Sequence, residues 1–170
     1  MRQLDFKRDI LPLKDIIFRT ALRITMNREE SEDIVQDILL KLWQQRDELE
    51  TVSNLEAFAL TSARNLAIDR ISKHEQRNIS LVEETHDRED IWQMSAHDTM
   101  ERDERQANIA SVIATLPEKQ RTVLQLRDIE GKAYKEIAEI IGITESDVKV
   151  NLFRARGFLK EKLHFLRRDK

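Results

Sequence analysis

Residues 134–153 read YKEIAEIIGITESDVKVNLF, and they carry the strongest structural signal in the chain. Gly142 supplies the positive φ that a tight turn between two helices needs. Ala138, four residues earlier, is small enough for a second helix to cross the first closely. Val148, six residues after the glycine, is expected to pack back against the first helix. This spacing predicts a helix-turn-helix, with Thr144 as the N-cap of the second helix.

The second helix of this motif has two different faces. Val148, Leu152, Ala155 and Leu159 recur at steps of four, three and four, which predicts the core side. The other side mixes polar, cationic and apolar groups: Ser146, Lys149, Val150, Asn151, Phe153 and Arg154. Such a mixture suits a DNA major groove, where Arg and Asn meet base edges and apolar groups meet thymine methyls. A merely solvated helix end would explain the bases but not Val150 and Phe153 turned away from the core.

Composition sets the fold class and excludes several others. The chain has 170 residues, 36% charged and 40% hydrophobic, with 3 Gly and 2 Pro, which predicts an all-α protein. Cysteine is absent, which excludes disulfides and cysteine-ligated metal sites. The N-terminus lacks the apolar core of a signal peptide, and no apolar run is long enough to span a membrane. We therefore expect a cytoplasmic location and no membrane insertion.

The net charge of −3 conceals an uneven distribution. Residues 83–104 hold nine acids against two arginines, whereas residues 147–168 hold seven bases against two acids. An acidic middle therefore precedes a basic end, and the basic end coincides with the predicted DNA-binding helix.

Helical periodicity divides the rest of the chain into segments. Ser31 is predicted to cap a helix from 32 to about 48; further helices are predicted over 8–26 and about 55–75. Periodicity is lost over 78–100, and a second helical module starts near 104. We expect two small helical domains joined by a flexible acidic linker: 1–78, the linker 79–103, and 104–170.

Two further surfaces look suited to binding. In the helix from 32, one side carries Asp33, Gln36, Asp37, Leu40 and Gln44, opposite the buried stripe. A scattered surface leucine is common, but a polar face with an apolar centre beside a DNA-binding module favours a protein-docking site.

In ARNLAIDRISKHEQR, residues 63–77, one face carries Asn65, Asp69 and Lys73, with Arg64, Arg70 and Arg77 close by. That face is suited to a phosphate backbone, and the polar loop 50–56, with Asn54, to a base pocket; an ordinary exposed helix remains an equal alternative.

Three stretches together resemble the extracytoplasmic-function (ECF) class of bacterial RNA polymerase sigma factors, over most of the chain. SEDIVQDILLKLW (31–43) resembles the helix that binds the polymerase clamp, and ARNLAIDR (63–70) the promoter-melting helix. Residues 116–156 resemble the reader of the upstream promoter element. The resemblance implies sigma domain two and sigma domain four joined by the linker. It also implies core RNA polymerase and promoter DNA as partners, commonly an anti-sigma factor, and no cofactor.

The resemblance also assigns residues by position. Asp33, Gln36, Asp37 and Leu40 would face the polymerase clamp. Asn54, Arg64, Asn65, Asp69, Arg70 and Lys73 would lie near the −10 element. Ser146, Lys149, Val150, Asn151, Phe153 and Arg154 would enter the −35 element. Asn151 stands where the family usually has arginine, which predicts a preference for adenine rather than guanine; Arg156 matches the family but borders the core.

The sequence gives less support to two other classes of function, an enzyme and a dimeric transcriptional regulator. His86-Asp87 and His97-Asp98 are similar to the pairs of metal phosphohydrolases, but both lie in the predicted linker, and the chain has only 4 histidines. No Gly-rich phosphate loop or nucleophile elbow is present, so we expect neither an enzyme nor a metal site. The alternative is a two-domain helix-turn-helix transcriptional regulator whose N-terminal helices dimerise. A dimerisation surface would need a broader apolar stripe than the face around Leu40 offers.

Overall fold

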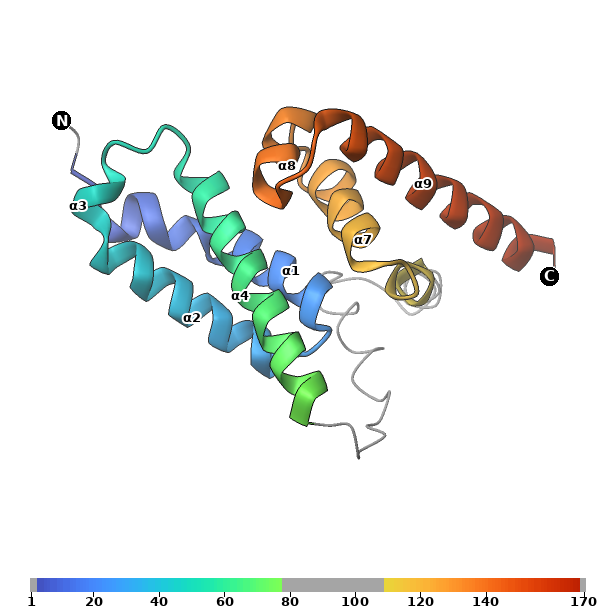
Figure 1. The fold of residues 1–170 in the computed structure, drawn as a ribbon, viewed down its shortest axis with the longest axis horizontal. Coiled ribbons are helices and arrows are strands. Elements are labelled where there is room, and N and C mark those ends of the chain that lie inside the picture. Colours follow the sequence, from blue (N-terminus) through green and yellow to red (C-terminus); the bar gives the residue numbers. More distant parts are fainter. Residues whose placement is uncertain (1–2, 78–108, 169–170) are drawn as a thin grey trace. The chain divides into compact units, whose positions relative to one another are not determined.

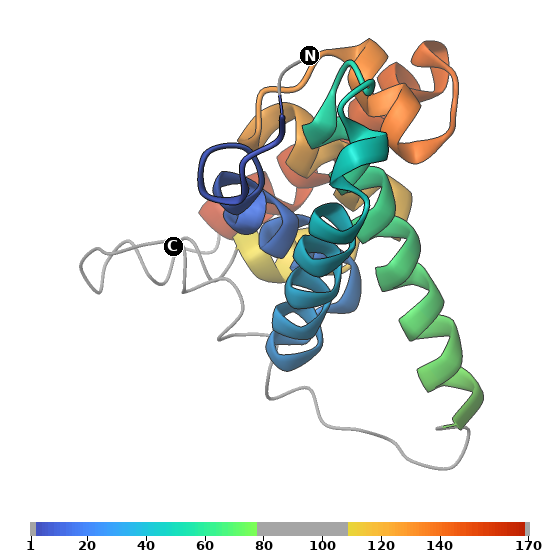
Figure 2. The ribbon, with the colours of Figure 1, turned by 90° about the vertical axis from the view of Figure 1, so that its left-hand side faces the viewer.

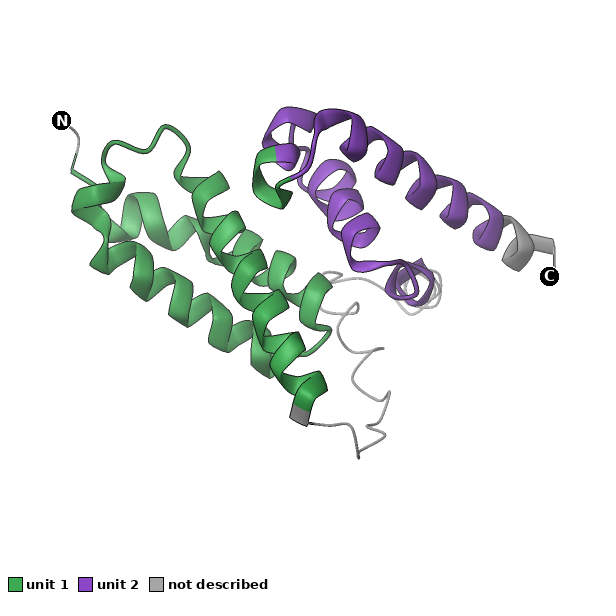
Figure 3. Cartoon of the chain, viewed as in Figure 1, with its two compact units in different colours: residues 1–82, 139–142 green, residues 83–138, 143–170 purple. Residues whose placement is uncertain are grey.

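The computed structural model describes residues 3–77 and 109–168, and within them it contains helices and turns but no strand (Figure 1). The all-α class is therefore confirmed for this part of the chain. Contacts divide the chain into two compact units, residues 1–82 with 139–142 and residues 83–138 with 143–170 (Figure 3). The predicted linker 79–103 and the two His-Asp pairs lie outside the described residues.

The first unit is a small bundle of helices. Its elements are a π-helical turn η1 (Phe6–Ile10), a 3₁₀ turn η2 (Leu11–Leu13), α1 (Lys14–Thr25), α2 (Arg28–Gln44), α3 (Arg46–Leu49) and α4 (Leu55–Arg77). Helix α1 packs against α2 and α4, and α2 and α4 lie side by side (Figures 1 and 2). Ile17, Ile34, Leu42 and Leu60 are fully buried in its core.

The start of α2 differs from the prediction. Asn27, not Ser31, is the N-cap: its Oδ1 accepts a hydrogen bond from the Glu30 N–H at 3.0 Å. Ser31 lies inside the helix, where its hydroxyl donates to the Asn27 carbonyl at 2.7 Å. Both residue types can cap a helix, and Asn27 prevails because its extended backbone leaves Glu29 and Glu30 in the first turn, near the positive end of the helix dipole. The helix also ends earlier than expected, at Gln44, before the short α3.

Helix α4 is confirmed over the predicted region, and its buried side explains how closely it packs. Ala59, Ala63 and Ala67 are fully buried at steps of four, together with Leu60. Small side chains at this spacing allow a neighbouring helix to approach the backbone closely. The opposite side of α4 is left for polar residues.

The second unit contains the helix-turn-helix apart from residues 139–142, which are grouped with the first unit. Residues 109–114 are helical and are followed by α7 (Glu118–Leu124), a π-helical turn η3 (Gln125–Ile129), α8 (Tyr134–Ile141) and α9 (Glu145–Arg168). Pro117 directly precedes α7, and α7 packs against α9.

The turn between α8 and α9 has the predicted local geometry. Gly142 has a φ of +78°, and the Ile143 N–H donates to the Ala138 carbonyl at 3.1 Å. The Thr144 hydroxyl oxygen accepts from the Asp147 N–H at 3.1 Å, which confirms the cap. Val148 is fully buried. A left-handed glycine followed by a capped helix therefore fixes the direction in which α9 leaves the turn.

A Gly142→Ala variant is expected to lower the free energy of unfolding by about 1–2 kcal/mol, because an L side chain disfavours the left-handed backbone. An added Cβ would meet no atom within 4 Å, so backbone strain alone is responsible. The matched control is Gly157→Ala in α9, where the Cβ is also uncrowded but no positive φ is required. That change should raise stability by about 0.5–1 kcal/mol. Urea unfolding of the full chain measures both, and equal stabilisation by the two substitutions would contradict this account of the turn.

Candidate functional site: three exposed helix faces

The first face lies on α2 and is acidic with an apolar centre. Asp33, Gln36, Asp37 and Leu40 are all exposed, and Leu40 leaves 55% of its surface in solvent. Ile34 on the other side of the same helix is fully buried, so the predicted buried and exposed sides of α2 are confirmed. An exposed leucine framed by carboxylates suits a partner that offers both cations and an apolar contact.

Aromatic groups extend this face toward the end of α2, and the sequence prediction missed them. Trp43 is 37% exposed, and its ring packs edge to face against Phe6, with centroids 5.7 Å apart. The Arg46 guanidinium lies 4.2 Å from the Trp43 ring centroid. Because Trp43 follows Leu40 by three residues, the helical period alone could have placed it next to Leu40.

The second face lies on α4. Asn65, Asp69 and Lys73 are exposed, as predicted, and Lys73 forms an i,i+4 ion pair with Asp69 at 3.2 Å. Arg64 belongs to the same helix. Asn54 precedes it as a cap, where its Oδ1 accepts from the Ala57 N–H at 3.0 Å. This capping bond uses the Asn54 oxygen, so its amide nitrogen is not required for the cap.

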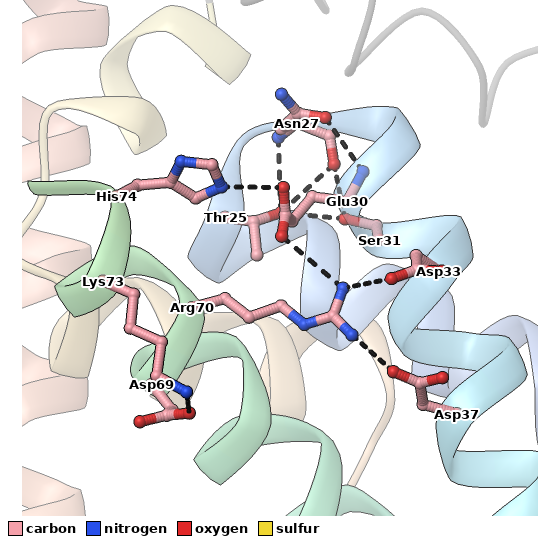
Figure 4. Close-up of polar contacts among 10 residues, drawn as sticks. All are labelled: Thr25, Asn27, Glu30, Ser31, Asp33, Asp37, Asp69, Arg70, Lys73 and His74. Atoms are coloured by element: carbon pink, nitrogen blue, oxygen red, sulfur yellow. Dashed lines mark hydrogen bonds and ion pairs between the residues drawn. The ribbon is translucent and has the colours of Figure 1, made fainter. Parts of the chain in front are cut away.

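Arg70 is the residue whose position the sequence did not predict. It reaches from α4 across to α2, where its Nη1 lies 2.5 Å from Asp33 and 3.5 Å from Glu30 and its Nη2 contacts Asp37 (Figure 4). Burial lowers the pKa of Arg70, but the hydrogen bond to Asp33 and the three carboxylate charges outweigh burial, and the net pKa is raised. His74, one turn further along α4, places Nε2 3.0 Å from Glu30 (Figure 4).

Glu30, Asp33, Asp37, Arg70 and His74 form one polar cluster between α2 and α4. The sequence analysis did not include Glu30 or His74. A signal existed, since Glu30, Asp33 and Asp37 recur at steps of three and four, and Arg70 and His74 at a step of four. The periodicity gives one acidic stripe and one stripe that carries Arg70 and His74. It does not reveal that α2 and α4 bring them together.

The third face lies on α9. Val150 and Phe153 are 44% and 78% exposed, while Val148 and Leu152 are buried on the other side, which confirms the two-faced helix. The polar and cationic members of the exposed face are Ser146, Lys149 and Arg154, all exposed, and the half-buried Asn151. In the absence of a partner, the Asn151 Nδ2 donates to the carbonyl of Asp147 at 2.7 Å. An adenine edge would have to replace this bond to the helix backbone.

Arg156 is held by a residue that the sequence did not associate with it. Its Nε donates to the Asp128 carboxylate at 3.0 Å, and its Nη2 contacts the other carboxylate oxygen. The hydrogen bond to Asp128 raises the pKa of Arg156 more than burial lowers it. Asp128 therefore neutralises Arg156, whereas Lys149 and Arg154 have no ion pair within the described residues.

A shallow hollow of about 380 Å³ lies beside this face. Its lining comprises Tyr134, Lys149, Leu152, Phe153, Arg156, Gly157 and Lys160. Two cations lie near the Tyr134 ring, with Arg127 at 4.4 Å and Lys149 at 5.6 Å from its centroid. Cations grouped around an aromatic ring beside a helix face suit a phosphate backbone.

Other kinds of site find little support in the described parts of the chain. Residues 3–77 and 109–168 contain no group of three or more His, Cys, Asp or Glu arranged to hold a metal ion. No helix within these two ranges combines the length and apolar character needed to cross a membrane.

Two known protein families match the chain. The family described as Sigma-70 region 2 matches residues 11–77, which include α2 and α4. The family described as Sigma-70, region 4 matches residues 96–159, which include the helix-turn-helix. Each exposed face described above lies within one of these matches.

Curated relatives agree with this assignment over most of their lengths. The ECF RNA polymerase sigma factor SigL of Mycobacterium tuberculosis is 32% identical over 141 residues, which cover 82% of this chain and 78% of SigL. The ECF RNA polymerase sigma factor SigW of Bacillus subtilis is 30% identical over 161 residues, which cover 90% of this chain and 86% of SigW.

Two solved structures match the fold of this chain. The sigma factor RpoE from Bartonella quintana, solved in complex with the anti-sigma factor NepR, matches with a TM-score of 0.76 and 25% identity. The match covers 94% of this chain and 97% of RpoE. CnrH, solved with the cytosolic domain of CnrY, shares the fold with a TM-score of 0.66 and 19% identity.

Proposed function

Since the chain belongs to the ECF class of RNA polymerase sigma factors, we propose that α2 docks on core RNA polymerase while α4 and α9 contact the two elements of a promoter. A protein of this class binds core polymerase and directs transcription initiation at particular promoters. The comparisons do not favour the alternative, a regulator with an N-terminal dimerisation domain. The observation that carries the assignment of residues is Phe153, an aromatic side chain 78% exposed on a cationic helix face within the region 4 match.

On α2, the docking residues are Asp33, Gln36, Asp37 and Leu40. Their support is the acidic face with Leu40 exposed at its centre. Carboxylates steer and orient a basic partner, and a desolvated leucine contributes binding energy once the partner covers it. Trp43 extends the same apolar contact.

On α4, the −10 residues are Arg64, Asn65, Asp69, Arg70 and Lys73, with Asn54 at the helix start. Asn65 and Lys73 are exposed on one side of the helix, which supports contact with a strand of DNA. Cations along that side would follow phosphates, and amide groups would meet unpaired bases.

On α9, the −35 residues are Ser146, Lys149, Val150, Asn151, Phe153 and Arg154.

An Asn151→Ala variant is expected to relax the preference for particular bases at one or two base pairs by about 1–3 kcal/mol, because a good amide contact to adenine is lost. Lys160→Ala should instead weaken all duplexes about equally and reduce the salt slope by about one, because a phosphate contact carries no sequence information. Competition binding against single-base variants of one promoter, at several salt concentrations, measures both. If Lys160→Ala changed base preference as Asn151→Ala does, this division of α9 would be wrong.

The remaining features follow from the same function. We assign residues 1–78 to sigma domain two, 79–103 to the linker and 104–170 to sigma domain four. We assign the protein no catalytic role and place it in the cytoplasm with the polymerase. Because RpoE was solved with an anti-sigma factor, we also propose that such a partner binds this chain.

The direct test is assembly with core polymerase. The purified chain should co-elute with core polymerase on size exclusion, and duplex promoter DNA should bind tightly only to the assembled complex. A chain that dimerised, ignored core polymerase and bound duplex DNA by itself would instead be the dimeric regulator.

A further inference from the structure

One guanidinium joins two of the proposed binding faces. Arg70 belongs to the DNA face of α4, yet its contacts are Asp33 and Asp37 of the docking face, with Glu30 beside them (Figure 4). Within the described residues, every ion pair of Arg70 is made with a carboxylate of α2. In the free chain, therefore, this cation is bound by carboxylates and is not offered to DNA.

The accessible members of this cluster are the carboxylates of Asp33 and Asp37. The Arg70 side chain is 19% exposed, whereas those of Asp33 and Asp37 are 59% and 50% exposed. A cationic surface can thus reach Asp33 and Asp37 without first displacing Arg70. Three carboxylates also face one guanidinium, so the cluster keeps an excess of negative charge that attracts such a surface.

Glu30 is the weakest of the three contacts with Arg70, at 3.5 Å, and it has a second partner in His74 at 3.0 Å. Once Asp33 and Asp37 are taken by another cation, only this longer contact would hold Arg70. A phosphate could then compete for the guanidinium on favourable terms.

We infer that Arg70 couples polymerase docking to DNA binding: Asp33 and Asp37 hold it in the free chain, and a basic polymerase surface that takes these carboxylates releases it to a promoter phosphate. This inference rests on the proposed docking of α2. It makes the two binding events cooperative, and linkage requires that DNA bound at Arg70 strengthens polymerase binding by the same factor.

If Arg70 had only a structural role between α2 and α4, the expected effect of its removal on polymerase binding would have the opposite sign. If Arg70 only holds the two helices together, Arg70→Gln weakens both polymerase binding and DNA binding. If Arg70 competes with the polymerase for the carboxylates, Arg70→Gln strengthens polymerase binding and weakens DNA binding. The signs of the two changes therefore separate the roles.

The first experiment uses the free full-length chain and a short fluorescent oligothymidylate. Asp33→Asn with Asp37→Asn should tighten binding about 3- to 10-fold and steepen the salt dependence by about 0.7, the amount expected for one added phosphate contact to a single strand. In the Arg70→Gln background the same two changes should give neither effect, because no guanidinium is released.

The matched control is Asp47→Asn with Glu48→Gln on α3, which removes equal charge but has no ion pair with Arg70. It accounts for the general loss of repulsion between the chain and DNA. A gain as large in this control, or one that persists in the Arg70→Gln background, overturns the inference.

The second experiment measures the affinity of full-length variants for core polymerase. Arg70→Gln should bind about 2- to 10-fold tighter than the unmodified chain, since the pairs it breaks are partly exposed and individually weak. Weaker binding by a variant with unchanged helical content overturns the inference.

If Arg70→Gln fails to fold, Arg70→Lys serves in its place. A single ammonium cannot bridge both aspartates, so polymerase binding should again become tighter, with a smaller gain. Failure of the unmodified chain to bind core polymerase would refute the proposed function instead. The first experiment, oligothymidylate binding by the free chain and its variants, does not depend on the polymerase.

Discussion

A Leu152→Ala variant is expected to lose about 2–5 kcal/mol of stability in the helix-turn-helix module, because it leaves a cavity where α9 meets the rest of that unit. Leu152 is 2% exposed, between the fully buried Val148 and Ala155 on the same side of the helix. A loss of this size is a large part of the stability of a small domain. Hydrogen exchange of the full-length chain, read by peptide, measures the loss where it occurs. The amides of α7 and α9 should lose protection together, while those of α1 and α2 keep theirs.

Its matched control is the adjacent residue on the opposite face. Phe153→Ala removes a larger side chain, but that side chain is 78% exposed, so protection in α9 should change little. DNA binding should fall instead, because the ring is available to thymine methyls. If Phe153→Ala unfolded the module as Leu152→Ala does, Phe153 would belong to the core and the DNA face would be misassigned.

Asp37→Arg combined with Leu40→Ala is expected to weaken binding to core polymerase by at least about 2 kcal/mol, or roughly 30-fold. The first change reverses one of the carboxylate charges of the acidic face, and the second removes its exposed apolar group. Like charges brought together across an interface cost several kcal/mol. Fluorescence titration of core polymerase with labelled chain measures the affinity.

Asp37→Arg also places a cation beside Arg70, so the helical content and thermal melt of the variant must be compared with those of the unmodified chain. Asp15→Arg provides a charge reversal at an exposed position of α1 outside the docking face. This control should leave the affinity close to that of the unmodified chain. Unchanged affinity in the Asp37→Arg, Leu40→Ala variant would remove α2 from the docking surface.

The features that the sequence predicted well depend on neighbouring residues. The turn at Gly142, the Thr144 cap and the two faces of α9 each follow from spacings of a few residues and the helical period. The same period correctly left Leu40 exposed. Where two capping residues stood close together, at Asn27 and Ser31, spacing alone selected the wrong one.

The features that the sequence did not predict depend on distant segments meeting. Arg70 pairs with residues 33 to 40 positions away, and Arg156 with Asp128, 28 positions away. A helical wheel shows which side a cation faces, but not which carboxylate the fold brings to it. Arg70 therefore looked like a candidate DNA contact in the sequence, and Arg156 like a residue at the border of the core, whereas in the free chain each is bound by acids.

In vitro transcription of fragmented genomic DNA, with mapping of transcript start sites, tests the central claim most directly. Core polymerase plus the chain should initiate at a limited set of positions that share a pair of sequence elements near −35 and −10. These positions should be lost when the chain carries Asp37→Arg with Leu40→Ala. Start sites that match those of core polymerase alone, under conditions where the chain co-elutes with core polymerase, would contradict the claim that this chain directs promoter-specific initiation.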